Sequence, residues 1–177
     1  MGRALLDAVT GMATRPQLLA VIDKEFARAS RRETTLALIM ADIDGFGEVN
    51  DRWGHDTGNR VLETFAEVLR SILRREDSAA RFGADEFVCV LPGADRDQAA
   101  AVAARIQQRF NANTAADQVV GRSGATASAG IAVYPADAQE VAALLEVASK
   151  ELAAAKSSHE LTGRSRHLRR VRDSAPS

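Results

Sequence analysis

One short stretch near the middle of the chain most constrains its fold, because two apolar segments there are separated by only a few residues. Residues 79–82 and 87–91 are rich in β-branched and aromatic side chains, so they predict two strands joined by a Gly-Ala turn. The adjacent carboxylates of Asp85 and Glu86 then lie at the tip of this hairpin. Neighbouring carboxylates repel each other unless water or a cation lies between them. The hairpin therefore predicts either a solvated loop or half of a metal site.

Length and composition favour one compact domain with a real core, because 46% of the 177 residues are hydrophobic and 27% are charged. We expect this domain to span residues 1–163, and residues 164–177 to form a basic C-terminal tail or an edge strand. The net charge of -1 argues against a general attraction to nucleic acid or membrane. Neither DNA nor a membrane is therefore expected as a partner.

The cysteine content and the lack of long apolar runs bear on the location of the protein. Cys89 is the only cysteine, which excludes an internal disulfide, and its apolar neighbours predict a small buried hydrophobe. No apolar run approaches the length of a membrane span, and residues 1–10 lack the core of a signal peptide. These features predict a soluble protein in the reducing cytoplasm, and such a protein can also be one domain of a longer chain.

Hydrophobic periodicity predicts helices and strands whose alternation is interrupted by the hairpin. Thr14 before an Arg-Pro pair is typical of a helix start. The expected elements are a helix from Thr14 to about residue 32, a strand over 34–43, a loop over 45–58, a helix over 61–73, the hairpin, a helix over 95–110, a loop over 111–124, a strand over 125–133 and a helix over 141–156. This order predicts the α+β class, with helices packed on an antiparallel or mixed sheet.

A third carboxylate, Asp42, lies at the end of the apolar strand over 34–43. If this strand lies beside the hairpin, Asp42 approaches Asp85 and Glu86. Hard oxygen ligands of this kind favour Mg²⁺ or Mn²⁺, held by few carboxylates and completed by phosphate oxygens and water. Phosphoryl-transfer sites are commonly built in this way. Spacing alone leaves open the alternative that these are separate surface carboxylates.

Four segments of the sequence carry a resemblance to a known family. Together they resemble the GGDEF domain of diguanylate cyclases, over about residues 7–156. The segments are Asp7-Ala-Val-Thr-Gly-Met, Leu38-Ile-Met-Ala-Asp-Ile-Asp-Gly-Phe, Asn50-Asp-Arg-Trp-Gly-His and Arg81-Phe-Gly-Ala-Asp-Glu-Phe. The resemblance implies a five-stranded, mostly antiparallel sheet surrounded by helices, related to the catalytic core of adenylate cyclases. It also implies that active members join two GTP molecules, one held by each of two facing subunits, into cyclic di-GMP.

The resemblance assigns expected roles to the acidic residues. By position, Asp42, the carbonyl of Ile43, Asp85 and Glu86 match the metal ligands, for Mg²⁺ or Mn²⁺, and Asp85 and Glu86 also match the catalytic pair. In the family mechanism the 3′-hydroxyl of one GTP attacks the α-phosphate of the other, and metal ions offset the developing charge. A homodimer and a fused or separate signalling domain are the expected partners.

The resemblance also assigns the nucleotide contacts. Asn50 matches the contact to the guanine edge, where its amide can both donate and accept. Phe46 matches a residue that shapes the base pocket, with a plain core aromatic as the alternative. Lys156 matches a phosphate-binding lysine, with a solvated lysine as the alternative. Gly83 and Ala84 occupy the turn that approaches the nucleotide.

Several positions depart from the family pattern. Ala84 replaces the second glycine of the signature, where a Cβ could intrude or meet a positive φ. Gly47 removes a cation expected near the phosphates, and Asn59 replaces the aspartate that accepts from guanine, which should weaken base selectivity. The last helix lacks the usual tyrosine, and Gly163 begins a Gly-Arg-Ser that comes later than the family's Gly-Arg-Asn. These changes favour weak or absent cyclisation.

A second motif is complete. Arg74-Arg-Glu-Asp77 fits the RxxD inhibitory site that binds cyclic di-GMP in the family, and Arg105 is expected to add a contact. Arg74 could address the O6 and N7 edge of guanine, and Asp77 could accept from its N1 and N2 hydrogens. The alternative is structural, because arginine suits a helix end and aspartate suits the turn after it.

Three functions remain open at this point. The favoured one is a GGDEF domain with a degraded active site that binds cyclic di-GMP as a receptor or regulatory module. The second is an active diguanylate cyclase that its product inhibits. The third is a GTP-binding pseudo-enzyme that regulates a partner, or a cyclase with relaxed base choice because of Asn59.

Overall fold

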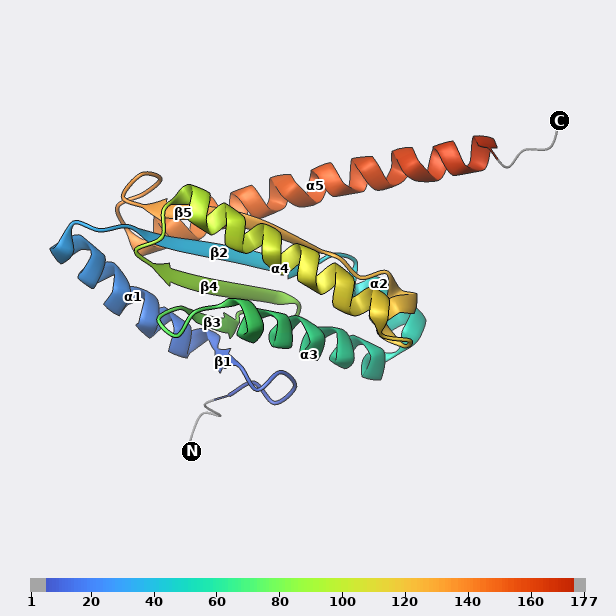
Figure 1. The fold of residues 1–177 in the computed structure, drawn as a ribbon, viewed down its shortest axis with the longest axis horizontal. Helices are drawn as coiled ribbons and strands as arrows, with labels where there is room; N and C mark the ends of the chain where they lie inside the picture. Colours follow the sequence, from blue (N-terminus) through green and yellow to red (C-terminus); the bar gives the residue numbers. More distant parts are fainter. Residues whose placement is uncertain (1–5, 174–177) are drawn as a thin grey trace.

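The structure is a computed structural model that describes the backbone of residues 6–173 and the side chains of residues 6–158. Its elements are shown in Figure 1. In chain order they are β1 (Ala13–Thr14), α1 (Arg15–Arg32), β2 (Leu36–Ile43), α2 (Phe46–Trp53), α3 (His55–Ile72), β3 (Ser78–Arg81), β4 (Glu86–Pro92), α4 (Arg96–Ala116), the 3-10 helix η1 (Val120–Ser123), β5 (Ala127–Tyr134) and α5 (Val141–Asp173).

The strands form one five-stranded mixed sheet in the order β1-β3-β4-β2-β5. The β1 and β3 strands are parallel, and every other neighbouring pair is antiparallel. The predicted α+β fold, with a mostly antiparallel sheet and the hairpin of β3 and β4, is confirmed. The hairpin and β2 end together at one end of the sheet, so their carboxylates are brought close.

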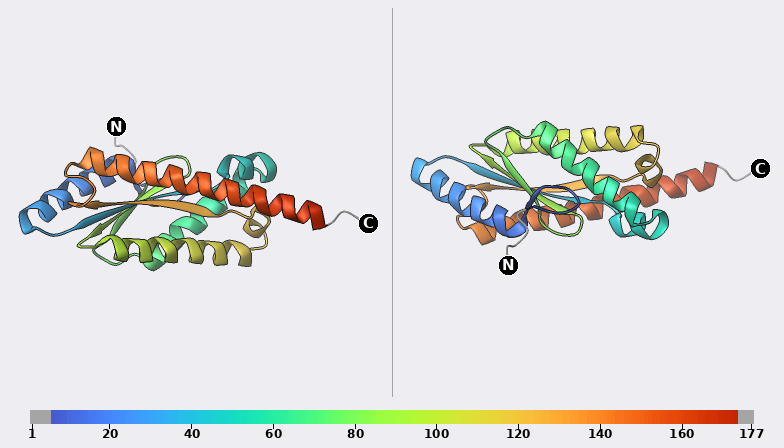
Figure 2. Two further views of the ribbon diagram at one scale, coloured as in Figure 1. Left: turned by 90° about the horizontal axis from the view of Figure 1, so that it is seen from above. Right: turned by 90° about the horizontal axis from the view of Figure 1, so that it is seen from below.

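Helices cover both faces of the sheet: α1 and α5 lie on one face, and α3 and α4 on the other (Figure 2). The side chains of β2 alternate between the two cores, as the two-residue period of a strand requires. Leu36, Leu38 and Met40 pack under α1 and α5, whereas Ala37 and Ile39 pack under α3 and α4. All eight residues of β2 are buried, so the strand predicted over residues 34–43 is confirmed and is covered on both faces.

The predicted loop over residues 45–58 was wrong, because this stretch contains α2 and the start of α3. Its glycines act as helix boundaries. Gly45 precedes α2 with a φ of 65°, and Gly54 separates the two helices with a φ of 84°. The buried Phe46 and Val49 lie three residues apart on the inner face of α2. The glycines of this stretch suggested a loop, but they end and start helices.

Two other boundaries differ from expectation. The α4 helix continues through residues 111–116, which were predicted as loop, because Phe110 and Thr114 are both buried one helical turn apart. Residues 164–173 continue α5, so the edge-strand alternative is wrong for them. Residues 174–177 lie outside the described part of the chain, and the domain boundary at residue 163 stays a prediction.

Two further expectations can be compared with the structure. Cys89 is fully buried in β4, as predicted, and burial raises the pKa of its thiol to about 12, which leaves it unreactive. Among residues 6–173, no helix combines the length and the apolar character that crossing a bilayer requires.

Candidate functional site

The strand register places the predicted carboxylates together at one end of the sheet. Asp42, at the end of β2, pairs with Glu86 of β4 and with Ser128 of β5. Directly opposed residues of antiparallel strands point to the same face. Met40 and Val88, each two residues further into the sheet, pack under α1 and α5. The side chains of Asp42 and Glu86 therefore lie side by side on the α1 and α5 face.

Asp42 is a buried carboxylate held by one cation. It is 6% exposed, and its Oδ1 lies 2.5 Å from Nζ of Lys156 on α5. The pKa of Asp42 is raised to about 6, because burial and the charges of Asp85 and Glu86 raise it by more than Lys156 lowers it. Lys156 is therefore not simply a solvated lysine, since its ammonium faces the carboxylate end of the sheet. Its predicted phosphate-binding role stays a prediction.

The hairpin tip is tied to the end of β2. The N–H of Ile43 donates to the backbone carbonyl of Asp85 at 3.1 Å. Burial and then the charge of Asp85 raise the pKa of Glu86, whereas Lys156 and Arg15 lower it. Three carboxylates thus share one electrostatic environment, although no group of three His, Cys, Asp or Glu side chains is gathered at metal-binding distance within the described residues.

The donor set fits a divalent cation of the Mg²⁺ type. Such a cation binds proteins through one or two carboxylates, and phosphate oxygens and waters complete its octahedral shell. Asp42 and Glu86 supply two hard oxygen donors on adjacent strands, and the buried Oδ1 of Asp42 already lies beside the Lys156 ammonium. A cation there would offset the repulsion between the carboxylates. The choice of Mg²⁺ or Mn²⁺ stays a prediction.

The alanine in the signature turn is not strained. Among the described residues, Glu33 is the only non-glycine residue with a positive φ, so the backbone of Ala84 has an ordinary conformation. Gly83 also lacks a positive φ, and a Cβ there would lie 3.4 Å from Cβ of Glu86. Of the two expected effects of Ala84, an intruding Cβ or a positive φ, the structure excludes the positive φ, so backbone strain gives no reason for lost activity.

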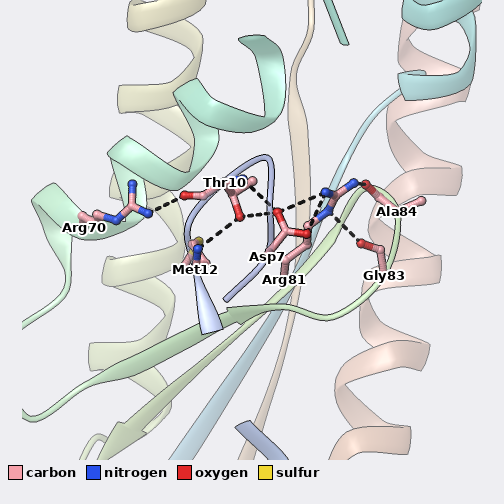
Figure 3. A network of polar contacts seen from close by, with 7 residues as sticks. All are labelled: Asp7, Thr10, Met12, Arg70, Arg81, Gly83 and Ala84. Carbon is pink, nitrogen blue, oxygen red and sulfur yellow. Dashed lines mark hydrogen bonds and ion pairs between the residues drawn. The ribbon is translucent and has the colours of Figure 1, made fainter. Parts of the chain in front are cut away.

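Arg81 fixes the shape of this turn (Figure 3). Its Nε donates to the carbonyl of Gly83 at 3.1 Å, and its Nη2 donates to the carbonyl of Ala84 at 2.6 Å. Its Nη1 lies 3.1 Å from each oxygen of the Asp7 carboxylate. The guanidinium thus ties the hairpin to the N-terminal loop. We assigned no role to Arg81 from sequence, although it begins one of the family segments.

Asp7 extends this network to α3 (Figure 3). Its Oδ1 accepts from the N–H of Thr10 at 2.8 Å and from the Thr10 hydroxyl at 2.7 Å. The carbonyl of Thr10 accepts from Nη2 of Arg70 at 2.5 Å. Burial alone would raise the pKa of Asp7, but the Thr10 hydrogen bonds and Arg81 together lower it. The charged form of Asp7 therefore stabilises the fold.

An Asp7→Asn variant tests this stabilisation through pH. A carboxylate with a lowered native pKa contributes stability above its unfolded pKa and loses it as the pH falls through the native value. We expect the variant to be less stable by about 1 kcal/mol at pH 7. The difference from wild type should shrink below the ordinary pKa of 3.8. Urea unfolding from pH 2.5 to 7, chosen to bracket the ordinary carboxyl range, measures this, and a constant difference would refute it.

The expected guanine contacts gather between α2 and α3. Oδ1 of Asn50 is buried and has no hydrogen-bond partner. A Cβ added to Gly58 would lie 1.8 Å from this atom and 3.4 Å from Cζ of Phe46. Phe46 is buried in the core, which supports its structural alternative. Asn59 is exposed at the start of α3.

The RxxD residues surround a separate cavity. Arg74, Asp77 and Arg105 line a volume of about 210 Å³, together with apolar atoms from the end of β4 and from α4. The N–H of Arg74 donates to Oδ2 of Asp77 at 2.8 Å, and the N–H of Asp77 donates to the carbonyl of Arg74 at 3.1 Å. Burial raises the pKa of Asp77, and the hydrogen bond from Arg74 opposes this. The turn thus presents both side chains to the helix that carries Arg105.

The fold and its carboxylate end define an α+β domain of the class found in diguanylate cyclases. The chain belongs to the GGDEF family: the model of that family, described as "Diguanylate cyclase, GGDEF domain", matches residues 4–161. This membership connects the chain to cyclic di-GMP signalling.

Relatives and solved structures agree with this assignment. The chain is 33% identical over 156 residues to the diguanylate cyclase DgcS of Shewanella oneidensis, covering 88% of this chain and 51% of that protein. It matches the diguanylate cyclase SiaD of Pseudomonas aeruginosa, in complex with its activator SiaC, with a TM-score of 0.78, 31% identity, and coverage of 88% and 59% of the two chains. It also matches the structure of the GGDEF domain of DgcB from Caulobacter crescentus in complex with c-di-GMP, with a TM-score of 0.74 and 27% identity. This match covers 89% of the present chain and 93% of the DgcB chain. The chain thus spans about half the length of DgcS.

Proposed function

We propose that this domain binds cyclic di-GMP at the cavity of Arg74, Asp77 and Arg105 and acts as a receptor or regulatory module. The observation that carries the proposal is that these three residues, from α4 and from the turn after α3, line one cavity. A guanidinium can donate to both O6 and N7 of guanine, and a carboxylate can accept from N1 and N2. Arg105 adds a cation for the phosphodiester or a plane for base stacking. The DgcB domain in complex with c-di-GMP supports this choice of ligand.

Altered substrate contacts support a reduced capacity to condense GTP. Residue 47 is a glycine, so this position offers no cation to the phosphates. Its surroundings are open, because an added Cβ would meet nothing within 4 Å. Asn59 offers one neutral acceptor where a carboxylate could accept two hydrogen bonds from guanine. Both changes weaken binding of the substrate without disturbing the fold.

A second function, condensation of GTP by a product-inhibited diguanylate cyclase, is favoured by the opposed Asp42 and Glu86 and by the unstrained Ala84. Asp42 and Glu86 would hold the cation, which would stabilise charge on the reacting phosphate when bound. Lys156 would neutralise phosphate charge from α5. The reaction needs two facing subunits, so this function also requires a homodimer.

One assay on nucleotide-free protein separates the two functions. The protein is incubated with GTP and Mn²⁺ and the products are identified by mass, and binding of cyclic di-GMP is measured by calorimetry in parallel. Binding without turnover supports the receptor. Binding together with product formation supports the inhibited cyclase. Absence of cyclic di-GMP binding excludes both proposals.

Arg74→Lys tests the cavity. Lysine keeps the charge but cannot donate two parallel hydrogen bonds to one base edge. We expect affinity for cyclic di-GMP to fall about tenfold or more, since hydrogen bonds from charged groups contribute about 1.5 to 3 kcal/mol. The matched control is Arg75→Lys, the next residue in the same turn, which does not line the cavity. Equal affinity in the two variants would exclude the cavity as the binding site.

A further inference from the structure

A row of side chains crosses the sheet at its carboxylate end. Glu86 and Asp42 are paired neighbours on β4 and β2. Phe82 continues the row on the other side of Glu86, because its N–H donates to the carbonyl of Glu86 at 2.7 Å. The ring of Phe82 packs against the core under α1 and α5, which is the face of both carboxylates. The row therefore consists of Phe82 directly after β3, Glu86 on β4 and Asp42 on β2.

Two helices bring one cation each to this row. Lys156 of α5 forms the ion pair with Asp42. Arg15, the first residue of α1, lies over the ring of Phe82, with its Cζ 4.4 Å from the ring centroid. The charges of both residues lower the pKa of Glu86. One cation thus lies at each end of the row, Lys156 beside Asp42 and Arg15 over Phe82.

The stacking contact fixes one face of the Arg15 guanidinium and leaves its edges available. A guanidinium donates hydrogen bonds in its own plane, so a ring against its face does not occupy them. Arg15 is exposed, so these donors are accessible from solvent. A planar donor fixed in this way matches the oxygens of a phosphate group. Lys156 alone would leave the other side of a triphosphate without a cation.

We propose that Arg15 binds the phosphates of a guanine nucleotide from the side opposite Lys156, and so supplies a cation where Gly47 offers none. The inference rests on one part of the second function proposed above, namely that the carboxylate end binds GTP, and it does not require turnover. It adds α1 to the elements that recognise the substrate. The proposal also makes Phe82 a positioning residue, because the Phe82 ring orients the guanidinium of Arg15.

The test compares ligands that differ only in phosphate. Binding of GTP with Mg²⁺, of GDP with Mg²⁺ and of guanosine is measured by calorimetry for wild type and Arg15→Gln. We expect the variant to bind GTP about tenfold more weakly and guanosine unchanged, because only the phosphate contact is lost. Arg15→Lys should recover part of the affinity for GTP. The control is Arg28→Gln. Arg28 is an exposed arginine further along α1 that forms an ion pair with Glu25.

Each outcome decides between the proposals. Unchanged GTP affinity in Arg15→Gln, or an equal loss for GTP and guanosine, overturns the role of Arg15. Failure of the wild type to bind GTP also overturns it, whereas binding of cyclic di-GMP in the same preparation would leave the receptor function standing. Normal GTP binding without turnover would remove only the cyclase.

Discussion

Substitution of Gly130 by alanine is expected to lower the free energy of unfolding by about 3 kcal/mol, at the upper end of the usual cost of overpacking a core. Gly130 lies in β5 beneath α5. A Cβ there would lie 2.2 Å from the carbonyl oxygen of Ala148 and 2.3 Å from the amide nitrogen of Leu152. These are backbone atoms of a regular helix, so no rotamer change relieves the contact. The helix must move away from the sheet.

This movement should also disturb the site. Lys156 lies one helical turn beyond Leu152 on α5. Its ion pair with Asp42 requires that α5 packs closely against β5. A displaced α5 would leave the Asp42 carboxylate buried without its cation, which is a costly arrangement. We therefore expect the variant to lose GTP binding as well as stability.

Urea unfolding followed by circular dichroism measures the change, with Gly47→Ala as the matched control. A Cβ at Gly47 meets nothing within 4 Å, and the residue lies in α2. Alanine there should leave the stability unchanged or raise it by up to about 1 kcal/mol, because alanine favours the helix. Equal midpoints for the two variants would show that the close approach of α5 to β5 is not required.

The elements predicted well are those whose signals are local. Thr14 and the following Pro16 marked the start of α1, and the apolar run of β2 marked a strand buried on both faces. The hairpin was also correct, because its two strands are adjacent in sequence. The approach of Asp42 to Glu86 then followed from one assumption about which strands are neighbours, and the register confirms it. The roles of these residues stay predictions.

The sequence did not predict the contacts that depend on tertiary structure. The β1 strand has only two residues, and it is a strand because Ala13 and Thr14 pair with β3. The Asp7 and Arg81 ion pair joins residues 74 positions apart, with no periodic signal to connect them. In sequence, Arg15 is an ordinary residue of the first helical turn. Only the fold shows that its guanidinium lies over the ring of Phe82.

The largest expected effect on substrate binding comes from Gly58→Ala. The added Cβ would lie 1.8 Å from Oδ1 and 2.9 Å from Cγ of Asn50. In contrast to Gly130, the obstructing atoms are the end of a side chain that can rotate away. Folding should therefore be preserved, and alanine within α3 should even favour the helix. Under the proposed contact between Asn50 and guanine, the displaced side chain would no longer present its amide to the base.

We expect Gly58→Ala to bind GTP about a hundredfold more weakly, because the guanine edge loses its partner and the space between α2 and α3 narrows. Cyclic di-GMP binding at the Arg74 cavity should be unchanged, since Gly58 does not line it. Calorimetry with both ligands measures this, with Asn50→Ala as the comparison and Gly47→Ala as the control in the neighbouring helix. If Gly58→Ala keeps wild-type affinity for GTP while Asn50→Ala loses it, Asn50 has reached the base by another rotamer, and the packing of α2 against α3 does not set guanine recognition.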